Sequence, residues 1–298
     1  MMDILITGAN GQLGNELQRI IRDGAAQIGP SFSDYRDARM ALTDMQELDI
    51  TDWPAVQRFV SEGGFDLIIN CAAYTDVDAC ETHQDLAYAV NADGPRNLAR
   101  AAQQTGAVLV HVSTDYVFAG DDPTPRIETD PCAPQSIYGK SKLLGEQAVA
   151  EECERYFIAR TAWLYGLVGK NFVKAILERA RSAGAIQVVD DQHGNPTNAN
   201  DLAYTLLKLA RTTEYGIYHA TNNGVCSWFD FAVAIVDGAG VPCTKTPCSS
   251  DEFVRAAKRP AYSMLDNARL RATVGDEMRE WQDALASYLA EYLAKERP

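Results

Sequence analysis

The sequence lacks long hydrophobic runs, a Cys-x-x-Cys pair and an excess of basic residues. No stretch of its 298 residues reaches the ~20 consecutive apolar residues of a membrane-spanning helix. The opening stretch MMDILITGANG has no basic segment ahead of its short apolar run, which argues against a signal peptide. The seven cysteines are odd in number and scattered, as is typical of reduced thiols. We therefore expect a cytoplasmic protein without a membrane partner.

The charge balance is acidic, with 27 Lys and Arg against 41 Asp and Glu and a net charge of −14. Such a chain is a poor partner for nucleic acid or for an anionic membrane. A small anionic ligand is still allowed, because a few backbone amides at a helix N-terminus can hold a phosphate. With 46% hydrophobic residues, the chain can bury a sizeable core.

Short apolar runs alternate with helical patterns over the first half of the chain. Helices are expected after the first strand, to about residue 22, and over residues 84–104. Strands are expected at residues 3–7, 41–42, 65–73, 106–114 and 156–162. This alternation predicts an α/β fold of the Rossmann type, with a doubly wound parallel sheet that binds ligands at the carboxyl ends of its strands.

From about residue 166 the strand signal weakens and amphipathic helices dominate, as in NFVKAILERARSAG and WFDFAVAIVDGAG. We predict a first domain over residues 1–165 and a mainly separate, smaller α/β domain over residues 166–298. Some later segments are expected to rejoin the first domain. The stretch from Trp281 onward reads as an amphipathic helix that packs on the body or on a neighbouring subunit.

A glycine-rich turn, TGANGQLG, follows the first strand and opens a helix. Gly8 permits a tight turn, Gly11 lets the backbone approach a pyrophosphate, and Gly14 allows close helix–strand packing. An ordinary βα turn is the alternative. Because strand, turn and helix stand in the required order, we predict a dinucleotide site here.

Such a site also uses an acid after the second strand, which holds the adenine ribose. Asp44 is the first candidate, although it follows the glycine turn by more than the usual ~20 residues. An insertion over residues 24–43 would absorb the difference. Asp49 is the second candidate, and either carboxylate could instead be a solvated loop residue.

Tyr138 and Lys142, in QSIYGKSK, lie four residues apart and share one face of a helix. A nearby ammonium favours the phenolate and lowers the pKa of a tyrosine, which is ordinarily ~10. The pair therefore predicts a tuned proton donor beside a nucleotide sugar, unless it is a solvated surface pair. Thr114, at the end of a predicted strand, could hydrogen-bond the carbonyl oxygen that Tyr138 protonates.

Three motifs, TGANGQLG, STDYVF and YGKSK, together resemble the extended short-chain dehydrogenase/reductase superfamily and, within it, the dTDP-4-dehydrorhamnose reductase family. The later segments RTAWLYG, NFVK, DDQHGNPTNANDLA and RPAYSMLDN resemble the same family in the same order, so the resemblance spans nearly the whole chain. It implies hydride transfer from NADPH or NADH to the C4 keto group of dTDP-4-dehydro-L-rhamnose, giving dTDP-L-rhamnose. Another nucleotide 4-keto-6-deoxy sugar is the close alternative.

The resemblance implies that Tyr138 is the general acid, that Lys142 holds the nicotinamide ribose, and that Thr114 polarises the keto group. With the glycine turn and the two acids, the expected cofactor-binding residues are Gly8, Gly11, Gln12, Leu13, Gly14, Asp44, Asp49, Ile50, Ala73, Tyr74, Thr75, Val112, Tyr138 and Lys142. The residues expected at the substrate are Thr114, Asp115, Trp163 and Arg259, whose guanidinium suits a pyrophosphate.

Other roles are known among similar chains. Sugar-nucleotide dehydratases usually carry a second acid where Tyr116 follows Asp115, and epimerases usually lack an acid at position 115. Regulatory subunits bind the dinucleotide without turnover, a role against which the intact Thr114, Tyr138 and Lys142 argue. Some family members bind magnesium between subunits, which leaves open a homodimer and Mg²⁺. Glu16 is a candidate ligand.

Overall fold

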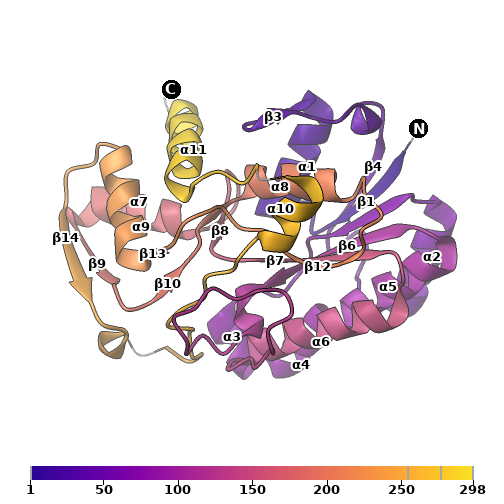
Figure 1. Cartoon of the computed structure of the whole chain (residues 1–298), viewed down its shortest axis with the longest axis horizontal. Coiled ribbons are helices and arrows are strands. Elements are labelled where there is room, and N and C mark those ends of the chain that lie inside the picture. The colour runs from indigo at the N-terminus through magenta and orange to yellow at the C-terminus, as the bar shows by residue number, and fades with distance from the viewer. Residues whose placement is uncertain (1, 254, 276, 297–298) are drawn as a thin grey trace.

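The computed structural model describes residues 2–253, 255–275 and 277–296. Its centre is a six-stranded sheet in the order β12–β7–β6–β5–β1–β4, and every neighbouring pair is parallel (Figure 1). The strands are β1 (Asp3–Thr7), β4 (Arg39–Thr43), β5 (Leu67–Asn70), β6 (Val108–Thr114), β7 (Tyr156–Thr161) and β12 (Gly216–His219). The predicted Rossmann-type α/β fold is confirmed, and so are the predicted strands, although three of them are shorter than expected.

Helices cover both faces of this sheet. One face carries α1 (Gln12–Asp23), α8 (Ala199–Leu209) and α10 (Ala268–Val274). The other carries α2 (Trp53–Gly63), α5 (Gly94–Thr105) and α6 (Ile137–Glu152). Ile4 and Ile6 of β1 belong to the first core and Leu5 to the second, because successive side chains of a strand point to opposite faces. Burial on both faces explains why β1 reads as a continuous apolar run.

The predicted helix over residues 84–104 is confirmed with an irregular centre. It consists of α4 (Gln84–Tyr88), a π-helical turn (Ala89–Asp93) and α5. Before it lies α3 (Val77–Thr82), which follows β5 through the loop that begins at Cys71. Single π-helical turns of this kind often mark functional sites.

The insertion between α1 and β4 packs on α8. It contains the short hairpin β2 (Ala25–Ala26) and β3 (Gly29–Pro30). Tyr35 donates a hydrogen bond to the Leu207 carbonyl at 2.8 Å, and the Phe32 ring lies 5.0 Å from the Tyr204 ring. The insertion therefore adds chain length before Asp44 while β4 keeps its place beside β1.

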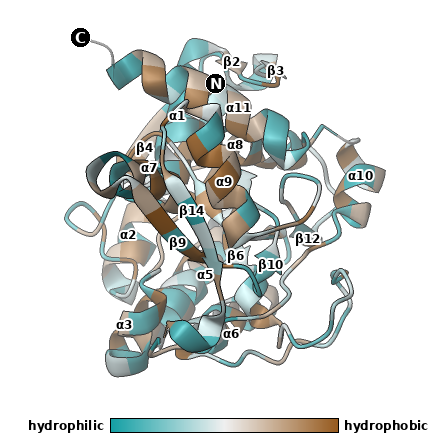
Figure 2. Cartoon of the chain, turned by 90° about the vertical axis from the view of Figure 1, so that its left-hand side faces the viewer, coloured by the Kyte–Doolittle hydropathy of each residue, from teal (hydrophilic) through white to brown (hydrophobic). Residues whose placement is uncertain are grey.

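A smaller lobe lies beside the sheet in Figure 1 and has its own core around Phe231 and Trp281. Figure 2 views the molecule from the side of this lobe. Its helices and longer strands are α7 (Phe172–Ala183), α9 (Trp228–Gly238), α11 (Trp281–Glu296), β9 (Ala185–Val189) and β14 (Thr244–Cys248). Its short strand pairs are β8 (Leu164–Tyr165) with β11 (Thr197–Asn198), and β10 (His193–Gly194) with β13 (Cys226–Ser227). The C-terminal helix α11 packs on the body, where Glu291 accepts from the Gln27 side chain at 2.9 Å.

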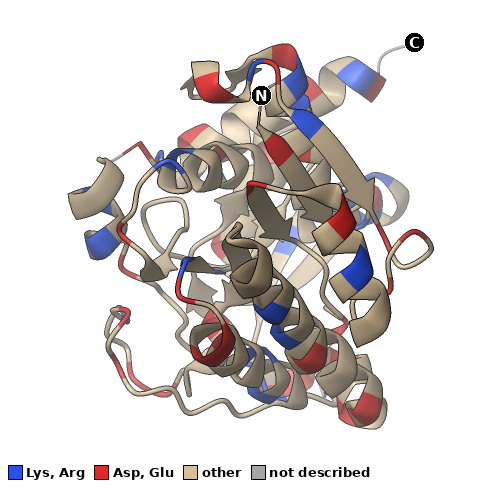
Figure 3. Cartoon of the chain, turned by 90° about the vertical axis from the view of Figure 1, so that its right-hand side faces the viewer, with Lys and Arg blue, Asp and Glu red and all other residues tan. Residues whose placement is uncertain are grey.

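Acidic and basic residues are interspersed over the face that carries α2, α5 and α6 (Figure 3). On α6, for example, Glu152 pairs with Arg100 of α5 at 2.8 Å. Among the described helices, none combines the length and the apolar character that crossing a membrane requires.

Gly14→Ala should destabilise the fold. A Cβ at Gly14 would lie 2.5 Å from the Gly8 carbonyl oxygen and 2.7 Å from the Ala9 Cα, both backbone atoms. Overpacking of about 1–3 kcal/mol should outweigh the ~1 kcal/mol that alanine gains in a helix. Denaturant unfolding measures the loss. Gly11→Ala, whose Cβ would lie 3.1 Å from the same oxygen, is the milder control, and equal stability of both variants would contradict the argument.

Candidate active site

A cavity of about 1000 Å³ opens at the carboxyl ends of β1, β4, β5, β6 and β7. Strand order reverses between β1 and β5, and such a switch point is where α/β sheets bind ligands. The cavity brings together every residue predicted for the cofactor, and also Thr114, Asp115 and Trp163. Arg259 does not line it. Arg259 lines a neighbouring cavity of about 270 Å³, which shares Tyr116 and Trp228 as walls.

The glycine turn presents the N-terminus of α1 to the cavity. Gly8 has a φ of 63° and lies so close to the chain after β5 that a Cβ would come 2.7 Å from the Ala72 nitrogen. Gly11 is the N-cap of α1, and no side chain of the described residues caps this helix. Its first amides and its dipole therefore favour an anion, so the turn fits a dinucleotide pyrophosphate.

Asp44 directly follows β4, which pairs with β1 residue by residue up to Thr43 and Thr7. The Asn10 amide of the glycine turn donates to Asp44 Oδ2 at 3.2 Å, so this carboxylate lies beside the turn despite the long insertion. Asp49 lies further along the same wall, where its Oδ1 accepts hydrogen bonds from the amide and hydroxyl of Thr51.

The helix α6 begins just before the predicted acid. Ser136 caps it by accepting a hydrogen bond from the Gly139 amide at 3.1 Å, which places Tyr138 in the first turn. A Cβ at Gly139 would lie 2.2 Å from the Tyr116 carbonyl oxygen, so glycine lets α6 approach the end of β6. Tyr138 and Thr114 line the same cavity there.

Removal from water sets the protonation of the Tyr138–Lys142 pair. Burial raises the pKa of the Tyr138 phenol, and the nearby Thr114 hydroxyl opposes this rise. The prediction that Lys142 lowers this pKa is wrong, because burial raises it and Lys142 is not among the groups that act on it. Burial lowers the pKa of Lys142 itself to about 8, and its Nζ donates to the Val112 carbonyl at 2.7 Å.

Asp115 is 2% exposed, and burial raises the pKa of its carboxyl to about 6. The Thr114 hydroxyl donates to Asp115 Oδ1 at 2.9 Å. Tyr138 lines the same cavity wall as this hydrogen-bonded pair.

Trp163 closes the site on the side of the smaller lobe. Its φ of 46° is the one positive value among the described residues other than glycine. One face of its indole stacks on Trp228, with ring centroids 3.5 Å apart and planes 7° apart. Trp228 was not among the residues predicted for the site, and it enters from α9 of the smaller lobe.

Arg259 is held by Asp78, a residue that the sequence did not single out. Its Nη1 and Nη2 donate to the two carboxylate oxygens of Asp78 at 3.0 and 2.9 Å. Arg255 lies 3.7 Å from the same carboxylate. Asp78 is on α3, so this cluster fastens the loop of the smaller lobe to the helix that follows β5.

Asn91 lies at the π-helical turn and joins two parts of the cavity. Its Oδ1 accepts from the Tyr74 amide at 2.8 Å, and its Nδ2 donates to the Ser141 hydroxyl at 3.1 Å. Asn91 thereby fixes the cofactor-lining loop after β5 against α6. An asparagine within the helical run 84–104 was the signal that could have identified it.

Glu16, the candidate magnesium ligand, has its partners within the chain. Its carboxylate pairs with Arg19 at 2.6 Å and accepts from the Asn200 amide at 2.8 Å. Within the part of the chain that the structure describes, no three His, Cys, Asp or Glu side chains gather as a metal site would require.

Comparison with known proteins agrees with this geometry. A family model described as "RmlD substrate binding domain" matches residues 2–294. A protein of Mycobacterium tuberculosis named dTDP-4-dehydrorhamnose reductase is 45% identical, over 96% of this chain and 92% of that protein. The chain belongs to the dTDP-4-dehydrorhamnose reductase family.

Two further relatives of the dTDP-4-dehydrorhamnose reductase family bear on ligand and substrate. A crystal structure of the reductase from Bacillus anthracis in complex with NADP has a TM-score of 0.91, with 43% identity over 98% of this chain and 100% of that one. A Streptomyces antibioticus protein named as a probable dTDP-4,6-dihydroxy-2-methyloxan-3-one 4-ketoreductase is 40% identical, over 99% of this chain and 97% of that protein.

Proposed function

We propose that this chain reduces the C4 keto group of dTDP-4-dehydro-L-rhamnose to dTDP-L-rhamnose by hydride transfer from NADPH or NADH. The observation that carries the proposal is the pair of Tyr138 and Thr114 on one cavity wall. It lies in the same cavity as Lys142 and the uncapped N-terminus of α1. A proton donor, an ammonium and a pyrophosphate site are the parts that a nicotinamide-dependent keto reductase needs.

In this proposal Tyr138 protonates the keto oxygen. A raised pKa keeps the phenol protonated at neutral pH, and an alkoxide forming at C4 is more basic than a phenolate, so the transfer runs downhill. With substrate bound, the Thr114 hydroxyl turns its proton from Asp115 to the same oxygen and stabilises its developing charge. Lys142 binds the nicotinamide ribose. When bound, the dinucleotide supplies the hydride.

The substrate would span both cavities. Its sugar lies against Asp115 and Trp163, and its diphosphate passes Tyr116 toward Arg255 and Arg259. Guanidinium groups suit phosphate geometry, so Arg259 would exchange part of its contact with Asp78 for the diphosphate. The aromatic walls of the smaller cavity can stack a nucleoside base, and these walls are Phe172, Trp228 and Phe253.

Several finer features remain part of the proposal. The substrate is a nucleotide sugar, and a related 4-keto-6-deoxy sugar is the second candidate, which the 4-ketoreductase relative favours. We assign the dinucleotide mainly to residues 1–165 and the sugar nucleotide mainly to residues 166–298. A homodimer in the cytoplasm is the expected setting.

A panel of nucleotide 4-keto-6-deoxy sugars tests the substrate. Each sugar is mixed with the protein and either dinucleotide, nicotinamide absorbance is followed, and the product is identified by NMR. We expect the highest kcat/KM for dTDP-4-dehydro-L-rhamnose. If no member of the panel is reduced while the dinucleotide still binds tightly, the reductase role fails and the regulatory-subunit role takes its place.

Tyr138→Phe should lower kcat by about 10²–10⁴-fold, because the proton donor is lost. The Kd for the dinucleotide should change little, since the substitution removes only the phenolic oxygen. Steady-state kinetics and cofactor titration measure the two effects. Near-full activity in this variant would remove Tyr138 from the mechanism.

Both dinucleotides should be used, with NADH favoured. Asp44 lies where it can accept from a ribose 2′-hydroxyl, and Lys142 is the single basic residue among the described residues that line the cavity. Arg39, a candidate partner for a 2′-phosphate, instead pairs with Asp3 at the amino end of its strand.

Asp44→Asn should shift the ratio of kcat/KM values toward NADPH by roughly tenfold, equivalent to about 1.4 kcal/mol. Loss of the negative charge removes its repulsion of the 2′-phosphate. Asp49→Asn is the matched control and should leave the ratio in place, because Asp49 is held by Thr51. A shift in the Asp49 variant alone would assign the ribose to Asp49.

A further inference from the structure

A buried ion pair lies behind the predicted catalytic residues. Glu146 and Arg160 are each 2% exposed, and Arg160 donates to both carboxylate oxygens of Glu146, with Nη2 at 2.7 Å and Nε at 2.9 Å. The Ser113 hydroxyl also donates to Glu146 Oε1, at 2.5 Å. The carboxylate of Glu146 thus accepts from two strands, β6 and β7, while its own backbone belongs to α6.

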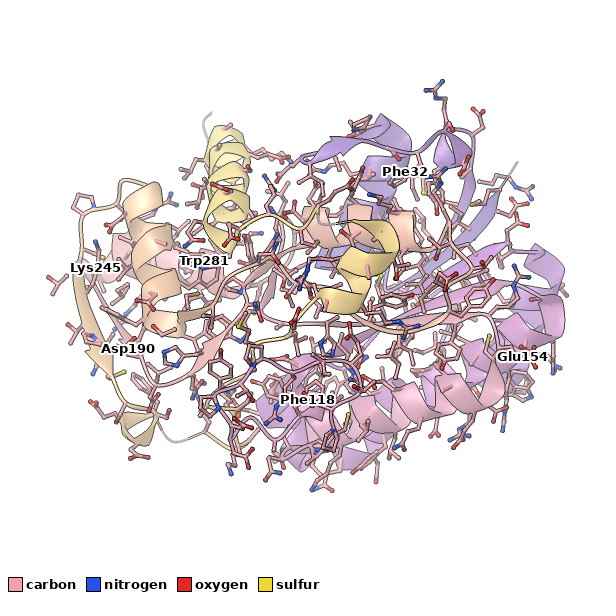
Figure 4. The ribbon with its side chains drawn as sticks, in the orientation of Figure 1. Phe32, Phe118, Glu154, Asp190, Lys245 and Trp281 are labelled. Atoms are coloured by element: carbon pink, nitrogen blue, oxygen red, sulfur yellow. The ribbon has the colours of Figure 1, made fainter. Side chains whose placement is uncertain are left out.

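The surroundings fix Arg160 as well. Its Nη1 donates to the Glu128 carbonyl at 3.3 Å and its Nη2 to the Cys132 sulfur at 3.4 Å. Its guanidinium lies 5.0 Å above the ring of Phe118, which Figure 4 labels. With every side of the pair occupied, the position of the Glu146 carboxylate is well defined.

Glu146 is one helical turn beyond Lys142, on the same face of α6. The charged and titratable groups that face Lys142 come from three elements. Glu146 is on α6, Cys71 follows β5, and His111 is on β6. Burial lowers the pKa of Lys142 because it disfavours the ammonium. The negative charge of Glu146 is the largest influence that raises this pKa again. Burial keeps His111 neutral and raises the pKa of the Cys71 thiol, so Glu146 supplies the negative charge.

The same carboxylate connects the two elements that carry the reacting hydroxyls. Ser113 immediately precedes Thr114 on β6, and Glu146 lies on the helix that carries Tyr138. The hydrogen bond from Ser113 to Glu146 therefore joins α6 to β6 beside the residue that carries the Thr114 hydroxyl.

We propose that Glu146 is a positioning residue of this reductase. Its carboxylate fastens α6 to β6 through Ser113 and holds the side chain of Lys142 in its charged form. The inference rests on the proposed role of Lys142. A buried ion pair is weak evidence for stability, because desolvation offsets much of its attraction, so a purely structural role explains less of this arrangement.

The test is the pH dependence of kcat/KM in Glu146→Gln. In the unmodified protein, activity should fall as the pH rises through about 8, because Lys142 loses its proton there. We call this fall in activity the alkaline limb of the pH profile. Without the Glu146 carboxylate the Lys142 ammonium is less stable, so the alkaline limb should move to lower pH by about one unit. Glu146→Asp keeps the charge and should return the limb toward its original position.

Glu152→Gln is the matched control. It makes the same chemical change on the same helix, but Glu152 pairs with Arg100 and not with a residue of the site. Its alkaline limb should coincide with that of the unmodified protein. If Glu146→Gln lowers kcat/KM by one factor at every pH, or leaves it unchanged, the ion pair is structural and the proposal is overturned.

Two more variants keep the outcome clear. If Glu146→Gln does not fold, the double variant Glu146→Gln/Arg160→Met removes both buried charges. It should still show a downward movement of the limb, of less than one unit, because the positive charge of Arg160 is lost as well. Lys142→Met should have no such limb. If the alkaline limb persists in Lys142→Met, the role of Lys142 is overturned. If the limb is lost in Lys142→Met but does not move in the Glu146 variants, only the role of Glu146 is overturned.

Discussion

Tyr138, Lys142 and Asp115 line one cavity where their side chains are withdrawn from water, and this desolvation displaces the pKa of all three. It raises the pKa of the phenol and the carboxyl and lowers that of the ammonium, because in each case the charged form is disfavoured. Neighbouring polar groups offset part of this desolvation by hydrogen bonding. The Thr114 hydroxyl donates to the Asp115 carboxylate, and the Val112 carbonyl accepts from Lys142.

Much of this arrangement was predictable from the sequence, because a parallel sheet gathers the carboxyl ends of its strands at one edge. The glycine turn after β1, Asp44 after β4, Thr114 at the end of β6 and the helix that carries Tyr138 all follow from strand order alone. The unusual spacing before Asp44 did not mislead the prediction of its position. The insertion packs on α8 and leaves the register of β1 with β4 intact.

The rest depends on contacts that local patterns do not encode. Trp228 reaches the site from the smaller lobe, and Asp78 meets Arg259 across a long sequence separation. The spacing of Tyr138 and Lys142 suggested a lowered phenol pKa, but spacing does not report how much water surrounds a side chain. Strand β12, four residues long, is recognisable only from its pairing with β7. The boundary at residue 165 stays a prediction.

Trp163 adopts a backbone conformation that residues other than glycine rarely adopt, with a φ of 46°. Placing a residue other than glycine in the left-handed region raises the free energy of the folded state by about 1–2 kcal/mol. This is a sizeable part of the free energy of unfolding of a typical protein, which is roughly 5–15 kcal/mol. The indole is thus kept at the cavity by packing on Trp228 and against Gly194, where a Cβ would lie 2.8 Å from the ring. Strain at Trp163 lowers the stability by which the chain could offset destabilising substitutions. The chain should therefore tolerate fewer random substitutions than its large core suggests.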